Sequence, residues 1–408
     1  MPRSRHGLAS GPRLEHAAFL MAAGTDRLFT PAFITLTLAE LAYFTAGGLV
    51  IGVTPFFVTG PLGSDEAGLG LVAGAFGITT LLLRPYAGRL SDRRGRRPLL
   101  IAGAALFAVV LFAHVLTNSL PLLIGLRLLL GVAEALFFVA GYAALVDLAP
   151  PGRTGEALSY NSLALYLGIA LGPALGQLLT DLGGYGAAWG GGGALCLLAA
   201  GLTLRMPETA VRLEPGDAAP RGLFHRAAVG PGLALFSGVA AMSGYLLLAG
   251  KHADSMGVEG WSVTFLVFGG VVVGLRALFA WLPDRMPPMR LGAASLAMIA
   301  AGLALVVVLP GYPGLLAGTV AVAAGVAFMT PALFSATFAR VAPEERGMAS
   351  GTATVFIDLG FSGGPFVAGS VAAALGFPAA FAVSAAIALV GAIGTLAALR
   401  SGGLPSTA

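Results

Sequence analysis

Long apolar runs, separated by short polar segments, follow one another along almost the whole chain. A helix needs about 20 apolar residues to cross the hydrocarbon of a bilayer, and these runs are long enough. Turn-forming residues stand between several of them, at 117–119, 183–184 and 310–313. The pattern predicts an all-α integral membrane fold of twelve transmembrane helices, at 32–57, 67–88, 98–117, 120–146, 158–180, 186–204, 228–250, 261–282, 291–309, 314–338, 348–375 and 378–399.

A longer polar segment at 206–226 divides the predicted helices into two groups of six. We therefore predict a cytoplasmic tail at 1–30, a first half at 31–205, a cytoplasmic linker at 206–226, a second half at 227–400 and a cytoplasmic tail at 401–408. The halves match at a constant offset of 192 residues, which indicates an internal repeat. The matched positions are Arg84, Leu90, Asp92 and Arg93 with Arg276, Leu282, Asp284 and Arg285, and Gly168, Gly172 and Pro173 with Gly360, Gly364 and Pro365.

Composition agrees with a protein embedded in a lipid bilayer. Hydrophobic residues make up 57% of the chain and charged residues 10%, whereas soluble domains carry about 25% charged residues. The net charge of +4 comes from the loops and gives no indication of nucleic-acid binding. With both termini in the cytoplasm, every basic residue except Lys251 and Arg127 falls on the cytoplasmic side or at helix ends facing it. The positive-inside rule therefore predicts that orientation.

The segment 88–100, GRLSDRRGRRPLL, concentrates arginine between two apolar runs. It resembles the signature loop of the major facilitator superfamily of transporters, G-x-L-a-D-r-x-G-r-k-x-x-l. The matching residues are Gly88, Leu90, Asp92, Arg93, Gly95, Arg96, Arg97 and Leu100. The resemblance implies two parallel six-helix pseudo-repeats that rock around a central substrate site, and we expect a monomer.

A cytoplasmic gate is the role that the resemblance implies for this loop. Asp92 can accept bonds from arginines and from helix N-terminal amides and so tie the halves together. Such a latch stabilises the outward-facing state in the family, and Asp147 at the end of helix 4 is a candidate partner for the arginines. The alternative is that the arginines determine topology and nothing more.

A second motif lies in helix 5, at 168–177. Its glycines recur every four residues, which allows close contact with another helix, and its proline favours a bend. The motif resembles the G-x-x-x-G-P-x-x-G pattern of antiporters, with Gln177 in place of a further expected glycine. We predict a symmetric pair of bending helices at the interface between the halves, formed by Gly168, Gly172, Pro173 and Gly176 and by the copy at Gly364 and Pro365.

Ionisable residues inside predicted membrane helices are candidates for function, because charge is costly there. The candidates for proton and substrate coupling are Glu40, Arg127, Glu134 and Asp358. Arg127 and Glu134 lie seven residues apart on one helical face; Arg127 either tunes the proton affinity of a nearby carboxylate or belongs to a structural ion pair that joins two helices. Asp358 could instead be an interhelical hydrogen-bonding group. Tyr43 and Phe44 share a face with Glu40 and are candidate substrate-binding residues.

These features together predict a secondary active transporter, a proton-coupled exporter of a small, partly hydrophobic drug or metabolite. The proton gradient would drive it without a cofactor, since the chain lacks a phosphate-binding G-x-x-x-x-G-K-[ST] string. We expect it in the plasma membrane of a bacterium. The nearer alternative is a proton symporter that imports a sugar, metabolite or lysolipid. The farther one is a membrane enzyme, which the scattered carboxylates do not favour.

Overall fold

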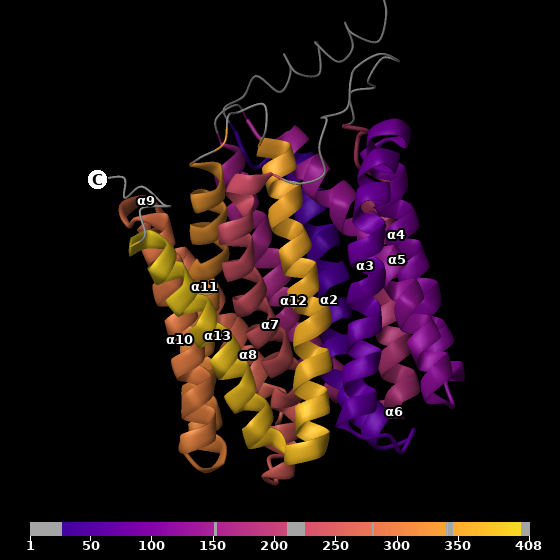
Figure 1. Cartoon of the computed structure of the whole chain (residues 1–408). Helices are drawn as coiled ribbons and strands as arrows, with labels where there is room; N and C mark the ends of the chain where they lie inside the picture. The colour runs from indigo at the N-terminus through magenta and orange to yellow at the C-terminus, as the bar shows by residue number, and fades with distance from the viewer. Residues whose placement is uncertain are drawn as a thin grey trace, which may run out of the picture.

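The protein is a bundle of long helices that lie side by side (Figure 1). The computed structural model describes residues 27–150, 153–209, 225–279, 281–339, 341 and 346–400, and no β-strand occurs among them. The predicted tails therefore fall almost entirely outside the described residues, and so does most of the predicted linker.

Two groups of helices make up the bundle. The first group contains α2 (Pro31–Thr59), α3 (Glu66–Arg94), α4 (Arg96–Ala113), the short 3₁₀ helix η1 (His114–Leu116), α5 (Leu120–Leu148) and α6 (Thr154–Thr203). The second contains α7 (Arg226–Ser255), α8 (Val263–Leu278), α9 (Leu282–Arg285), α10 (Pro288–Val308), α11 (Gly311–Phe338), α12 (Arg346–Leu375) and α13 (Phe377–Arg400).

The predicted twelve crossings are confirmed once α6 is counted as two. Ten described helices are long and apolar enough to span a membrane, and α8 is a shorter apolar helix. Within the 50-residue α6, Gly183 and Gly184 leave helical geometry, and Gly184 has φ of +70°. Glycine adopts that backbone conformation without steric cost. The kink therefore turns the chain back and separates two spans.

Polar caps and glycines fix several helix ends. The Asp65 side chain accepts from the backbone N–H of Gly68 at 2.9 Å and caps the start of α3. At its other end α3 continues through Arg94, and Gly95 with φ of +102° separates it from α4. The predicted loop at 88–97 is therefore wrong as a loop. The reason is that a helix continues past the point where its apolar stretch ends.

Helix packing repeats between the two groups. Helix α6 packs along α2, and α12 packs along α7, which are equivalent pairs under the 192-residue offset. Both crossings are close: a Cβ on Gly48 would collide with the Gly168 backbone, and one on Gly360 would collide with Val239 and Ala240. The groups meet where α3 packs against α12 and where α6 packs against α8, again an equivalent pair.

Candidate functional site

A buried carboxylate lies on α2 between α5 and α6. Glu40 is 3% exposed, and the side-chain amide of Asn161 on α6 donates to its Oε2. Gly141 on α5 leaves room for Glu40, because a Cβ there would collide with Oε1. The Thr37 hydroxyl donates to the Asn161 carbonyl oxygen at 3.4 Å. The carboxylate is thus held by a polar group inside the first half.

Glu134 on α5 is half-buried and lies within electrostatic range of Glu40. Arg84 on α3 and Asp358 on α12 also act on it. These four ionisable side chains come from four helices and both halves. Of the predicted coupling residues, the structure therefore groups Glu40, Glu134 and Asp358.

The ion pair between Arg84 and Asp358 connects the two halves. Arg84 Nη2 lies 3.0 Å from Asp358 Oδ1, and the side chains are 15% and 3% exposed. The guanidinium carbon also lies 4.5 Å from the Phe138 ring centroid, within cation–π range. Asp358 Oδ2 is buried and has no hydrogen-bond partner in the described part of the chain. One carboxylate oxygen thus stays available to a proton.

Arg84 lies inside α3, within the predicted helix at 67–88, and was not among the predicted coupling residues. A signal for its role was present, because the 192-residue offset pairs it with Arg276. That arginine also crosses between the halves: Arg276 Nη1 donates to Ser162 Oγ at 2.6 Å. Its guanidinium carbon lies 4.6 Å from the Tyr166 ring centroid.

Arg127 on α5 is 6% exposed and donates through Nη2 to the Thr54 hydroxyl on α2. No ion pair joins it to Glu134 among the described residues; instead Arg84 is the arginine that acts on Glu134. Arg127 and Glu134 thus meet different neighbours, and the predicted tuning of a carboxylate by Arg127 stays a prediction.

Tyr43 is packed inside the first half, and its predicted role in binding substrate stays a prediction. It is 1% exposed, and its ring stacks on Phe137 at 3.9 Å between centroids. Phe107 contacts the same ring edge-on at 4.9 Å. Phe44 is 9% exposed, and a Cβ on Gly168 would collide with its backbone. Helix packing rotates both aromatic residues away from a site open to solvent.

Several contacts close the bundle at the face where α2 ends and α3 begins, which we call the closed face. Gln177 Nε2 donates to the Glu259 carbonyl oxygen at 2.6 Å, and the Ser262 N–H donates to Gln177 Oε1 at 3.3 Å. The Phe56 and Trp261 rings stack at 4.5 Å. Each contact joins the first half to the second. Gln177, the departure from the antiporter pattern, is thus a bridging residue that motif matching alone did not reveal.

The face that carries the α3–α4 junction, which we call the loop face, is arranged differently. Arg96 is at its centre, with Nη1 2.6 Å from Asp92 Oδ1 and Nε 3.3 Å from Asp147 Oδ2. The Glu208 carboxylate accepts the Arg96 N–H at 2.8 Å and the Arg97 N–H at 3.3 Å. It therefore caps α4 in the way that was predicted for Asp92.

Each of these described contacts joins residues of the first half to one another or to Glu208 at the start of the linker. Arg93 is exposed, and Gly88 lies within α3 against Val139 of α5. Among the described residues, the predicted tie between the halves through Asp92 is thus not made in this conformation. A gating role for these residues stays a prediction.

The glycines of helix 5 pack against α2 rather than across the interface between the halves. A Cβ on Gly172 would collide with backbone atoms of Thr45, Gly48 and Leu49, and one on Gly176 would collide with Val53. The copy behaves alike, since a Cβ on Gly364 would collide with α7. The two helices themselves lie at the interface between the halves, where α6 packs against α8 and α12 packs against α3, but their motif glycines contact α2 and α7 within each half.

Gly168 and Pro173 complete the contact with α2, next to Phe44 and Gly52, and Pro365 lies against Gly70 of α3. Larger side chains take over at the interface itself: Tyr166 and Ala170 of α6 face Gly269 of α8. The glycine motif thus sets the distance between two helices of one half.

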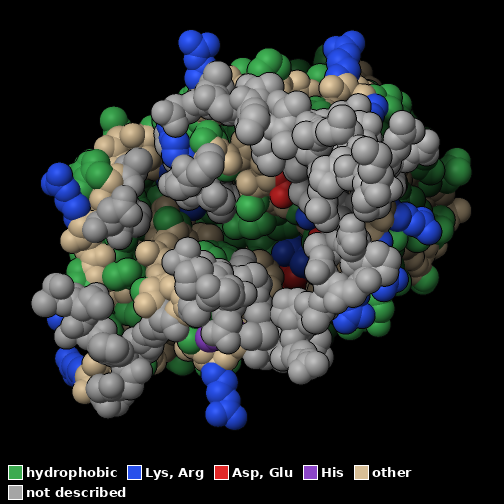
Figure 2. Space-filling view, turned by 90° about the horizontal axis from the view of Figure 1, so that it is seen from above, with side chains coloured by type: hydrophobic (Ala, Val, Ile, Leu, Met, Phe, Trp, Pro, Cys, Tyr) green, Lys and Arg blue, Asp and Glu red, His purple; other side chains and the backbone are tan. Residues whose placement is uncertain are grey.

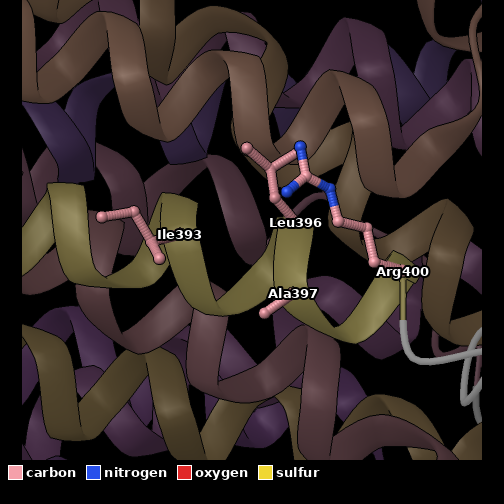
Figure 3. A pocket seen from close by; sticks show the side chains of 4 residues that line it. All are labelled: Ile393, Leu396, Ala397 and Arg400. Carbon is pink, nitrogen blue, oxygen red and sulfur yellow. The ribbon is translucent and has the colours of Figure 1, made fainter.

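The loop face has a hollow near its centre, with apolar, basic and acidic side chains in its depth (Figure 2). A separate pocket on α13 is lined by Ile393, Leu396, Ala397 and Arg400 (Figure 3). Its lining comes from one helix, and Ile393 is 57% exposed on the flank of the bundle. The pocket contains no carboxylate, so the central hollow is the better candidate for a transport site.

Known proteins share both sequence and fold with this chain. The family model described as Major Facilitator Superfamily matches residues 36–337. An uncharacterised transporter of this type from Salmonella typhimurium is 29% identical over 366 residues, which cover 86% of this chain and 92% of the relative.

Two solved structures extend the comparison to the fold. The nucleoside transporter NupG has a TM-score of 0.76 at 14% identity and covers 90% of this chain and 100% of its own. A bacterial homologue of the human lysosomal transporter Spinster, in an inward-facing and occupied conformation, has a TM-score of 0.76 at 14% identity, with coverage of 91% and 97%. From its sequence match and its twelve-helix fold, the chain belongs to the Major Facilitator Superfamily of membrane transporters.

Proposed function

We propose that the chain is a proton-coupled exporter of a small, partly hydrophobic organic compound in the plasma membrane of a bacterium. The observation that carries this proposal is the group of carboxylates inside the bundle. Glu40 and Glu134 belong to the first half, Asp358 belongs to the second, and Arg84 links the halves. A charge at this depth is costly, so protonation of these groups competes directly with their charged contacts.

The difference between the loop face, which has a central hollow, and the closed face supports alternating access. If the loop face is cytoplasmic, as the distribution of arginines predicts, the hollow admits a compound from the cytoplasm while Gln177 and Trp261 hold the other face shut. Transport then requires the closed face to separate and the loop face to close. The two halves rock about the central site in this scheme.

Asp358 gives the scheme a link between protons and conformation. While it is ionised, its contact with Arg84 holds α3 and α12 together. A proton on its unpartnered Oδ2 removes the negative charge and with it most of the attraction. Glu134 lies within electrostatic range of Arg84, so in this scheme it attracts the released guanidinium. Proton entry would thus change which half attracts Arg84.

Everted membrane vesicles test the proposal. Cells with and without the protein are first compared for resistance to a panel of drugs and metabolites, with and without an uncoupler. Compounds to which the protein confers resistance are then added to vesicles that hold a pH gradient, which a fluorescent weak base reports. An exporter that exchanges protons dissipates the gradient, whereas a symporter that imports the compound does not do so in this geometry.

Variants assign the coupling groups. Glu40→Gln, Glu134→Gln and Asp358→Asn keep shape and remove charge, and we expect at least one to abolish dissipation at unchanged abundance. Asp254→Asn, an exposed carboxylate at the closed face, is the matched control. Export that persists after the proton gradient is collapsed would contradict proton coupling. Retention of full exchange by all three variants would remove these residues from the mechanism.

A further inference from the structure

Two arginines occupy equivalent positions at the interface between the halves. Arg84 on α3 and Arg276 on α8 are related by the 192-residue offset, and the same offset relates Tyr166 on α6 to Asp358 on α12. Arg84 contacts Asp358, and Arg276 contacts Tyr166, with Nη2 3.4 Å from the hydroxyl. The repeat is thus preserved in three dimensions, but one of its two carboxylates is replaced by a phenol.

This replacement leaves Arg276 with neutral partners. Its guanidinium donates to Ser162 Oγ at 2.6 Å, to the Ala327 carbonyl oxygen at 3.0 Å and to the Tyr166 hydroxyl. No carboxylate lies within 4.0 Å of it in the described ranges of the chain, whereas Arg84 has Asp358 at 3.0 Å. A guanidinium inside a membrane protein is costly without a counter-ion. The Arg276 position therefore favours an added negative charge.

The surroundings of Arg276 select the kind of anion. Arg276 is half-buried, so part of the residue is accessible, and the hollow of the loop face contains basic side chains (Figure 2). Its planar fork matches a carboxylate with two parallel hydrogen bonds. The Tyr166 ring lies beside it at 4.6 Å and offers apolar surface as well as a hydroxyl donor. A carboxylate attached to an apolar body fits both features.

We propose that Arg276 and Tyr166 bind the carboxylate of an amphipathic organic anion, in the place that the Asp358 carboxylate occupies opposite Arg84. The inference rests on the proposed transport function and specifies its substrate class. Because Arg276 belongs to the second half and Tyr166 to the first, the bound anion also connects the halves. The substrate carboxylate would then join the halves between α6 and α8, as the Asp358 carboxylate joins them between α3 and α12.

Equilibrium binding to the purified full chain, without any proton gradient, tests this assignment. The probes are three carboxylates of different size (benzoate, naphthoate and decanoate), each with the amide and the amine of the same shape. We expect at least one carboxylate to raise Tm and to bind more tightly than its amide and its amine. Arg276→Gln should weaken that binding by about tenfold to a hundredfold, as expected for a hydrogen bond to a charged group. Arg276→Lys should restore part of it.

A second variant separates binding from folding. Tyr166→Asp supplies Arg276 with the internal carboxylate that the repeat lacks, so it should abolish carboxylate binding while keeping or raising the Tm of the ligand-free protein. Arg290→Gln, which removes an exposed arginine of the second half, is the matched control and should bind like wild type.

Two results would overturn the assignment: amides that bind as tightly as carboxylates in all three series, or carboxylate binding that Arg276→Gln leaves intact. Failure of the carboxylate-binding assignment can be distinguished from failure of the proposed transport function. Exchange of neutral or cationic compounds for protons, without carboxylate binding, would keep the proposed function and reject this inference. Carboxylate binding without proton coupling would do the reverse.

Discussion

Arg84 and Asp358 join the two halves of the bundle through one ion pair, with 3.0 Å between Nη2 and Oδ1. Few described contacts combine charge, burial and a position between the halves in this way. The pair has incomplete hydrogen bonding, since Arg84 Nε and Asp358 Oδ2 are both buried and have no hydrogen-bond partner among the described residues. An incompletely satisfied pair is easier to separate than a bidentate one, which suits a contact that must break during transport.

A double-mutant cycle measures this contact. We expect Arg84→Gln and Asp358→Asn each to lower the free energy of unfolding, and the double variant to lose about 1.5–3 kcal/mol less than the sum, because each single change leaves one charge unpaired. Chemical denaturation in detergent gives the four values. Since a protonated Asp358 carries no charge, the coupling should be present at neutral pH and disappear as the pH falls. Additive effects at neutral pH would show that the contact contributes nothing.

The closed face depends on Gln177. We expect Gln177→Ala to remove two hydrogen bonds between the halves, each worth about 1 kcal/mol, and so to populate the conformation that is open at this face. A cysteine introduced at Ser262 should then react faster with a polar thiol reagent. Thr180→Ala is a suitable control, because its hydroxyl bonds within its own helix to Gly176. Equal labelling of both variants would argue against a closing role.

Close packing of α6 on α2 is the basis of the next prediction. Gly172→Leu should lower the free energy of unfolding by at least about 1–3 kcal/mol, because the leucine side chain has no space between the two helix backbones. It should also strongly reduce transport. Thermal unfolding and vesicle exchange provide the two readouts. Gly190→Ala lies in the second span of α6 with no atom within 4 Å of the added Cβ and should leave both readouts unchanged. A stable, active Gly172→Leu protein would contradict the packing role.

The loop face offers a test of the predicted gate. Asp92 is 51% exposed and contacts Arg96, so Asp92→Asn should cost about 1 kcal/mol or less in this conformation. If Asp92 ties the halves together once the loop face closes, the variant should nevertheless transport poorly at normal abundance and should favour the conformation seen here. Labelling of a cysteine placed in the central hollow reports that shift. Normal transport with unchanged labelling would remove the latch role.

Local pattern in the sequence predicted the twelve spans, the kink at Gly183 and Gly184 and the internal repeat, and the fold confirms them. Hydropathy is sufficient for this because a membrane helix must satisfy its backbone within itself. Glycine spacing likewise marked Gly168 and Gly172 as points of close approach, which they are. The helix that these glycines contact could not be predicted from the sequence, since small residues permit close contact with any neighbouring helix.

The partners of polar side chains were decided by tertiary structure. Helix rotation put Tyr43 into the packed interior and brought Glu208 to the start of α4, although neither outcome has a local signal. Among the described residues, Asp92 contacts Arg96 of its own half and no residue of the second half. Arg84 was partly predictable. The internal repeat pairs it with Arg276, but its contact with Asp358 arises only where α3 meets α12. Sequence therefore determined which segments cross the membrane, and packing determined which charges meet, because pairing depends on distances between helices that no local pattern encodes.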